Sequence, residues 1–380
     1  MGLLSVMRAI AGHWNWCFYS FIGLGFLMPS LPAWALVFYT LFVPLFTVRC
    51  TVGRSRTVPA EAWGGIVFIG WALLSFLWSP SWHGWLDAVW SVLFIAGGLY
   101  AIEDDPAFSE RVKRICIAGS TVNSAMSLGK QILGMTYNIR PGGVGMLHVT
   151  LPSVIIAGVC LIWACEALLK NKELKREALL AAVILPSFMF LSGSRTPCLC
   201  VAVALMVLLC RAPRYHWRRI LIYGGSGLAL FCLLLRDRVR AFLYDAVARG
   251  DSFHRAIWKS VWHDALQHPW IGHGFGALTA VHIQNMVFAH AHNLYLDVFF
   301  QGGAVGLVLL LTACIWPFIG AKRSNVGIVA CFFFLSCVLL TDMASPLKGP
   351  AEIWYVLWVP WLCLVASEKN IRVSKACPML

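Results

Sequence analysis

The sequence predicts an all-α integral membrane protein that crosses the bilayer many times. Its 380 residues are 59% hydrophobic and 12% charged, whereas a soluble domain carries about 25% charged residues. The apolar residues gather in runs close to the ~20 residues that a helix needs to span a bilayer, and the alternating pattern of a membrane β-barrel is absent. In addition, basic residues concentrate in every second connection between these runs.

About twelve apolar spans can be placed along the chain by hydropathy. They lie near residues 12–28, 31–48, 63–79, 85–101, 115–134, 147–169, 178–193, 196–211, 219–235, 292–319, 325–341 and 352–367. The first is taken as a span rather than a cleaved signal, because no small-residue cleavage site follows it. The chain then divides into a first group of spans at 1–235, a long polar loop at 236–291, and the remaining spans with a cytoplasmic tail at 292–380.

The side of the membrane on which each connection lies follows from its basic residues. Most of the 30 Lys and Arg residues fall in one alternating set of connections, namely Arg8; Arg49, Arg54 and Arg56; Arg111, Lys113 and Arg114; Lys170, Lys172, Lys175 and Arg176; Arg211, Arg214, Arg218 and Arg219; Lys322 and Arg323; and Lys369, Arg372 and Lys375. Cytoplasmic loops carry an excess of Lys and Arg. Both termini are therefore predicted to be cytoplasmic, and the loop at 236–291 extracytoplasmic.

The formal net charge of +13 does not indicate a nucleic-acid partner, because the basic loops account for most of it and no soluble basic domain is present. The 14 cysteines lie mostly inside apolar runs, where they pack as small hydrophobic residues. No CxxC pattern occurs. We expect neither a structural disulfide nor a zinc site.

The loop at 236–291 contains a predicted amphipathic helix. Asp251 or Ser252 can cap its start, and His268-Pro269 ends it after Gln267. Polar residues recur at steps of four on one face and apolar residues on another; they are Arg255, Lys259, His263 and Gln267, and Phe253, Ile257, Val261 and Ala265. Such a helix either lies in the membrane interface, with its aromatic face toward lipid or the helix bundle, or is an ordinary amphipathic surface helix.

After this helix, the segment Pro269-Trp270-Ile271-Gly272-His273-Gly274-Phe275-Gly276 has glycines at alternate positions. The pattern predicts a tight, exposed turn whose amides, including that of Gly274, are free to approach a ligand. It is not a dinucleotide-binding fingerprint, because no strand precedes it and no helix of the required unit follows.

The polar loop ends in a histidine-rich segment that leads directly into the next span. Histidine suits proton transfer near neutral pH, which makes His290 and His292 candidates for chemistry. Asn293 can orient a histidine or a substrate. Tyr295 and Asp297 can line the opening of the same candidate site. An ordinary interfacial role for the histidines is the alternative. A zinc site is not completed by a carboxylate or cysteine at suitable spacing.

Two extracytoplasmic connections each carry one arginine among small residues: Arg140 in Arg-Pro-Gly-Gly-Val-Gly and Arg195 in Ser-Gly-Ser-Arg-Thr-Pro. Tight turns at a membrane surface do not need arginine. Anchoring to lipid headgroups can explain either residue alone. Because both lie on the same predicted side as the long loop, convergence on a bound anion explains them better.

These motifs occur in a fixed order: Arg140-x-Gly-Gly-x-Gly, Ser192-Gly-Ser-Arg195-Thr, Arg255-x-x-x-Lys259, Pro269-x-x-Gly-x-Gly-x-Gly276 and His292-Asn-x-Tyr-Leu. Together they resemble the O-antigen ligase and polymerase superfamily of bacterial envelope glycosyltransferases, over nearly the whole chain. The resemblance implies a GT-C-like membrane fold in the bacterial inner membrane, with a periplasmic catalytic loop at 236–291. It also implies an undecaprenyl-diphosphate-linked glycan donor, a lipid A-core or glycan acceptor, and no cofactor, nucleotide sugar or metal.

The resemblance also implies roles for individual residues. Arg195 and Arg255 would hold the carrier diphosphate with help from Arg140, and His292 would be the catalytic histidine. Asp342 would be the acidic residue that some members carry in the last extracytoplasmic loop. The other predicted substrate-binding residues are Lys259, His290, Asn293, Tyr295 and Gly274.

The leading functional prediction is an O-antigen ligase that is metal-independent and inverts the anomeric centre. A polymerase that extends lipid-linked repeat units uses the same donor and leaving group, and is the first alternative. A transporter or flippase of a lipid-linked anion is the alternative from another class. That class predicts charges near the bilayer midplane and an internal repeat, and the sequence shows no convincing repeat.

Overall fold

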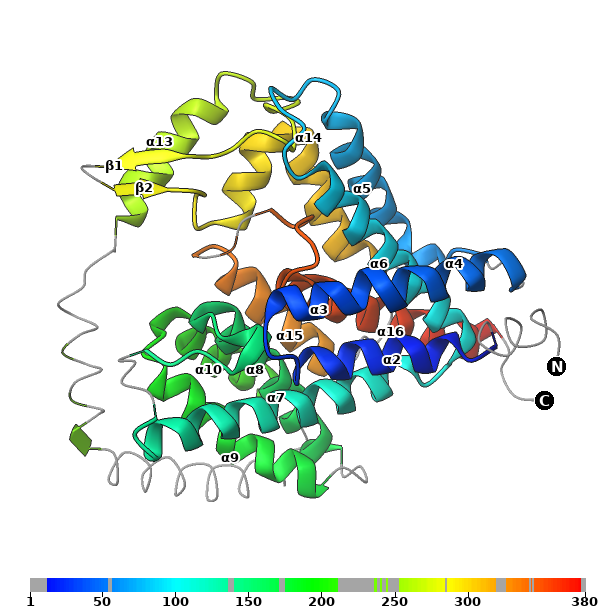
Figure 1. Ribbon diagram of the computed structural model, residues 1–380, viewed down its shortest axis with the longest axis vertical. Coiled ribbons are helices and arrows are strands. Elements are labelled where there is room, and N and C mark those ends of the chain that lie inside the picture. The colour runs from blue at the N-terminus through cyan, green and yellow to red at the C-terminus, as the bar shows by residue number, and fades with distance from the viewer. Residues whose placement is uncertain are drawn as a thin grey trace.

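The computed structural model describes residues 12–53, 57–135, 140–170, 175–210, 253–283, 286–318, 326–341 and 345–376, and positions 236, 237, 240, 244 and 343. Within these ranges the chain is helical apart from one β-hairpin (Figure 1). The α-helices are α2 (Trp14–Gly25), α3 (Leu31–Val37), α4 (Val43–Val52), α5 (Trp63–Ser75), α6 (Trp85–Asp104), α7 (Phe108–Ile132), α8 (Thr150–Leu169), α9 (Lys175–Leu191), α10 (Arg195–Cys210), α13 (His254–Ala265), α14 (Leu294–Ile315), α15 (Val326–Val338) and α16 (Val359–Ala376). The hairpin strands are β1 (Val281–Ile283) and β2 (Met286–Phe288).

Every predicted span that falls within the described residues coincides with helix; the span near 219–235 lies outside them. Four helices of the described chain are long and apolar enough to cross a membrane, namely Leu31–Val52, Trp85–Asp104, Thr150–Leu169 and Leu294–Phe318. Two boundaries differ clearly from the prediction, the start of α7 and the end of α16, which continues to Ala376 rather than ending near residue 367. Helix α7 begins at Phe108, so Lys113 and its basic neighbours lie in its first turns rather than in a loop.

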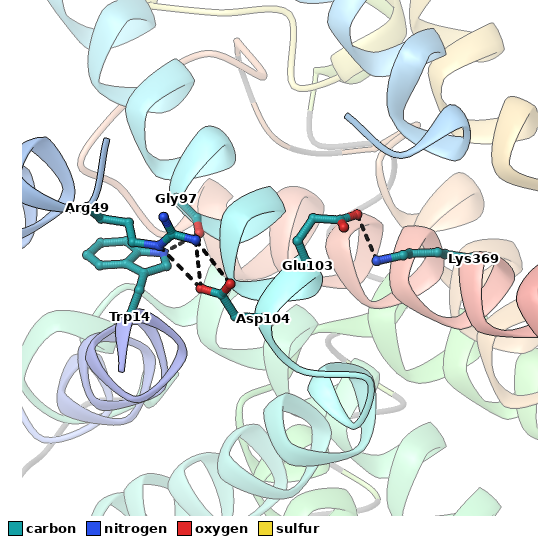
Figure 2. A network of polar contacts seen from close by, with 6 residues as sticks. All are labelled: Trp14, Arg49, Gly97, Glu103, Asp104 and Lys369. Carbon is teal, nitrogen blue, oxygen red and sulfur yellow. Dashed lines mark hydrogen bonds and ion pairs between the residues drawn. The ribbon is translucent and has the colours of Figure 1, made fainter. Parts of the chain in front are cut away.

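Ion pairs join the helices on the side of the molecule opposite α13 and the hairpin, near α4 (Figure 1). Arg49 of α4 contacts Asp104 of α6 at 3.1 Å, and Lys369 of α16 contacts Glu103 at 2.7 Å (Figure 2). Lys113 of α7 contacts a carboxylate of α8 at 3.2 Å with only 6% of its side chain exposed. This pairing explains how a predicted loop residue can lie buried within a helix.

Helix α14 is interrupted at Gly303, whose φ of 65° and ψ of −167° are not helical. Such a break leaves backbone groups without helical partners, and inside a membrane other protein groups must satisfy them. The loop after α13 supplies four hydrogen bonds: Ala304 N to Pro269 O (2.8 Å), Val305 N to Trp270 O (3.1 Å), His273 N to Phe300 O (3.0 Å) and Gly274 N to Gln301 O (2.8 Å). The glycine-rich turn therefore provides hydrogen-bond partners for backbone groups of α14 around the break.

The glycines of this turn are required by close backbone contact. Gly272 has a φ of 68°, and a Cβ there would lie 2.4 Å from the carbonyl of Gln301. Gly272, Gly274 and Gly276 are all buried. The prediction of an exposed turn with free amides is wrong, because the N–H groups of His273 and Gly274 are already bonded to α14.

Helix α13 packs on α14 through the predicted apolar stripe, since Ile257, Val261 and Ala265 are buried. Phe253 occupies the N-cap position without a side-chain capping bond; the predicted caps Asp251 and Ser252 lie outside the described residues. The hairpin packs beside α13 and pairs Val281 with Phe288 and Ile283 with Met286. The all-α prediction missed this hairpin, because three-residue strands have too few positions to show an alternating pattern.

Candidate active site

Segments far apart in the sequence enclose a polar pocket of about 250 Å³. Its lining contains two arginines and two histidines and, within the described residues, no carboxylate. The lining residues are Arg140, Leu151, Gly193, Ser194, Arg195, Thr196, Pro197, His254, Phe288, His292, Val338 and Thr341. A second cavity, of about 210 Å³, is lined mostly by apolar residues of α5 and α6 and offers no comparable set of functional groups.

The segment that carries Arg140 is fastened to α7 and α8. Ser127 of α7 donates to the carbonyl of Gly142 at 2.6 Å, and Thr150 of α8 donates to the carbonyl of Arg140 at 3.1 Å. A Cβ at Gly142 would lie 1.9 Å from a backbone oxygen, so only glycine allows this approach. The Arg140 guanidinium donates long hydrogen bonds, both 3.5 Å, to the Ser192 carbonyl and the Ser194 hydroxyl, which places it against the turn that holds Arg195.

Arg195 is the first residue of α10, directly after a tight Ser-Gly-Ser turn. Gly193 takes a φ of 66°, and the buried Ser192 hydroxyl accepts a bond from Ser194 N at 3.2 Å. The first turn of α10, from Arg195 to Pro197, lines the pocket. The partial positive charge of a helix N-terminus then adds to the charge of the arginine.

His254 begins α13 and His292 lies two residues before α14, and both line this pocket. Their ring centroids lie 6.0 Å apart at an interplanar angle of 88°. The segment before His292 is fixed by Trp258, whose Nε1 donates to the Ala291 carbonyl at 3.1 Å. His290 packs on His292 with ring centroids 4.0 Å apart, and its Nδ1 accepts from His292 N at 3.2 Å.

Backbone strain concentrates beside the pocket. Among the described non-glycine residues, those with positive φ are Phe253 (67°), His292 (49°) and Met343 (74°). His292 lines the pocket, Phe253 precedes the lining residue His254, and Met343 lies two residues after Thr341. Left-handed conformations of such residues cost on the order of 1–3 kcal/mol and cluster at functional sites. This strain is a second, independent indication that the pocket is functional.

The structure thus brings together Arg140, Arg195 and His292 as the sequence predicted. It does not place Arg255 in the pocket lining: Arg255 and Lys259 are exposed on α13. Asp342 lies outside the described residues.

The remaining predicted residues have structural contacts. Asn293 caps α14 by accepting from the backbone N–H groups of Tyr295 and Leu296, each at 3.1 Å. The Tyr295 hydroxyl donates to the Ser336 carbonyl at 3.2 Å. Asp297 is buried and accepts from the Thr279 hydroxyl at 2.6 Å and from Ala291 N at 3.3 Å. These three residues fix the start of α14 rather than line the pocket.

Sequence reasoning missed His254, Ser194 and Thr341. The stripe at steps of four drew attention to Arg255, whereas the residue before it faces the pocket. A helical-wheel comparison of His254 with Trp258, one turn later, could have placed both on the side that faces the His292 segment.

The pocket can bind an anion, because guanidinium, imidazole and hydroxyl groups converge on it with the N-terminus of a helix. Histidine can in addition accept or donate a proton. In the part of the chain that the structure describes, no group of three His, Cys, Asp or Glu side chains is placed to hold a metal ion.

Two comparisons show which known proteins this chain is similar to. Residues 180–311, which include Arg195, His254 and His292, match the family model described as Wzy_C, O-antigen ligase. The chain is also 26% identical to an O-antigen ligase of Pseudomonas aeruginosa over 283 residues, which cover 73% of this chain and 68% of that protein. The fold, with four helices long and apolar enough to cross a membrane, is that of a multi-pass membrane protein, and both matches are to O-antigen ligases. The chain is thus similar to the O-antigen ligase family, in line with the resemblance of its ordered motifs.

Proposed function

We propose that this protein is an O-antigen ligase that transfers a polysaccharide from undecaprenyl diphosphate to lipid A-core oligosaccharide. The observation that carries the proposal is the convergence of Arg140, Arg195 and His292 from three remote segments on one pocket, in a chain whose residues 180–311 match the O-antigen ligase family model.

The arginines suit a diphosphate leaving group. As the anomeric C–O bond breaks, its electron pair passes to the diphosphate oxygen, and negative charge grows there. Arginine offers fixed, paired N–H donors to such an oxyanion, and each hydrogen bond to a charged group contributes about 1.5–3 kcal/mol. Because Arg140 and Arg195 lie on one wall with the start of α10, that wall is the proposed diphosphate site. The exposed Arg255 and Lys259 remain proposed contacts for the outer part of the donor.

His292 is the proposed general base. The acceptor hydroxyl oxygen forms the new bond to the anomeric carbon, and its proton passes to a ring nitrogen of His292. A positioned base of this kind contributes about 10²–10⁴-fold to the rate. A single displacement inverts the anomeric configuration; a product with retained configuration would contradict this mechanism.

The proposed topology has about twelve spans, with both termini in the cytoplasm and the loop at 236–291 as the periplasmic catalytic segment between spans at 1–235 and 292–380. It is supported by the separation of the ion-paired side around Arg49 and Asp104 from the side that carries α13 and the hairpin (Figure 1). The bacterial inner membrane is the proposed location.

The test is transfer in vitro with purified full-length protein and an undecaprenyl-diphosphate-linked glycan. In separate reactions, lipid A-core and a second lipid-linked glycan serve as acceptors. Glycan appearing on lipid A-core supports the ligase. Lengthening of the lipid-linked chain alone identifies a polymerase, and movement of intact donor across a vesicle membrane without transfer identifies a flippase; either result contradicts the proposal.

A further inference from the structure

We infer that His254 is a donor-binding residue whose imidazole N–H donates a hydrogen bond to a phosphoryl oxygen of the carrier diphosphate, opposite Arg140 and Arg195. The inference rests on the proposed function and adds to it a residue that the family motifs did not point to.

The position of His254 carries the inference. It is the first residue of α13 and lines the pocket together with both arginines. Its ring packs on Trp258, with centroids 5.7 Å apart, and Trp258 is itself bonded to the Ala291 carbonyl. The imidazole is therefore held by the same contacts that hold the His292 segment.

The two walls of the pocket offer complementary contacts to one diphosphate. Arg140 and Arg195 come from the α8 and α10 side, whereas His254 comes from α13. The start of α13 adds the partial positive charge of its first N–H groups. An anion between the walls would thus be contacted from both, which a single wall of arginines cannot do.

His254 and His292 are suited to different tasks. Their rings are perpendicular and 6.0 Å apart between centroids, so each can point its nitrogens at a different substrate group. His292 lies at the entrance to α14 and, as the proposed general base, accepts the proton of the acceptor hydroxyl. His254 acts as an N–H donor to the phosphate.

Helix geometry also separates His254 from Arg255. Consecutive residues of an α-helix point about 100° apart, so the two side chains cannot share one orientation. His254 is half-buried and lines the pocket, whereas Arg255 is exposed. We therefore assign the contact with the diphosphate inside the pocket to His254.

The experiment compares purified full-length variants in two assays: donor KM and kcat in the transfer reaction, and binding of inorganic diphosphate followed by tryptophan fluorescence. His254→Phe keeps the ring packing on Trp258 but lacks N–H donors, His254→Ala removes the ring, and His254→Asn restores a donor. His263→Phe, at an exposed position of the same helix, is the matched control.

We expect His254→Phe and His254→Ala each to raise the donor KM and the diphosphate dissociation constant about tenfold, as for one hydrogen bond to a charged group. His254→Asn should recover most of the affinity, and His263→Phe should match the wild type. The acceptor KM should not change in any variant.

Unchanged donor KM and diphosphate affinity in both His254→Phe and His254→Ala would overturn the inference. A fall in kcat with unchanged donor KM would also overturn it, because it would assign His254 to proton transfer. If the wild-type protein performs no transfer, the proposed function fails by itself, and the diphosphate binding assay still decides the role of His254.

Discussion

Two sides of this molecule use the same basic residue types in opposite ways. Arg49 and Lys369 each contact a carboxylate of α6 (Figure 2), and Lys113 contacts a carboxylate of α8. The side chains of Arg49 and Lys113 are almost fully buried. In the pocket, Arg140 and Arg195 meet two histidines, and the described lining holds no carboxylate.

The difference shows how placement decides the role of a charge. A buried cation paired with a buried carboxylate joins helices, and removing one partner leaves an unpaired charge in an apolar environment. Cations that converge from turns on a polar cavity create a site for an external anion. Variants on the first side should therefore change stability, and variants on the second should change activity.

The largest expected effect is on the rate of transfer. His292→Ala should lower kcat by about 10²–10⁴-fold, because it removes the proposed general base. The melting temperature should change little, since His292 lies at the pocket surface rather than in the core. Transfer assays on protein of confirmed monodispersity measure kcat, and thermal unfolding measures the melting temperature. Full activity in the folded variant would remove His292 from the mechanism.

The next largest effect is expected on the opposite side. Lys113→Met should lower the free energy of unfolding by about 1.5–3 kcal/mol, the contribution of a hydrogen bond to a charged group, because Glu166 then loses its buried partner and keeps only Lys170. The remaining folded protein should transfer glycan at the wild-type rate. Denaturant unfolding in detergent gives the stability. Arg114→Ala, which breaks the exposed pair with Glu177, is the control and should cost about 0–1 kcal/mol.

Arg195→Ala tests the pocket wall itself. The loss of a charged hydrogen bond of about 1.5–3 kcal/mol corresponds to a decrease of roughly 10–150-fold in kcat/KM for the donor. Arg195→Lys should recover only part of this, because an ammonium group lacks the paired donors of a guanidinium. Wild-type kcat/KM in Arg195→Ala would show that the arginine does not contact the donor.

The smallest of these effects concerns the glycine-rich turn that packs on α14. Gly272→Ala should destabilise the protein by about 1–3 kcal/mol from its backbone conformation alone, and should lower activity by displacing α14 around its break at Gly303. Thermal unfolding measures the first effect. Gly70→Ala in α5, where a Cβ would have no atom within 4 Å, is the control; equal stability of the two variants would contradict the role given to the turn.

Much of the architecture was readable from local pattern. Hydropathy placed the helices within the described residues to within a few positions, because long apolar runs leave the chain little choice in a membrane. The start of α7 and the end of α16 were missed, since the pattern cannot show that Lys113 and Lys369 are each paired with a carboxylate of another helix. The structure of the long loop, including the hairpin, depends on packing against α13 and α14, and its local sequence pattern gives little indication of it.

The sequence by itself predicted the membrane class, the resemblance to O-antigen ligases, and the candidates Arg140, Arg195 and His292, because residue type and order carry that information. Only the tertiary structure decided that the glycine-rich turn serves α14, that Asn293 is a helix cap, and that His254 rather than Arg255 reaches the pocket. The reason is physical: whether a polar group is satisfied by the protein or left for a ligand depends on neighbours that are distant in sequence.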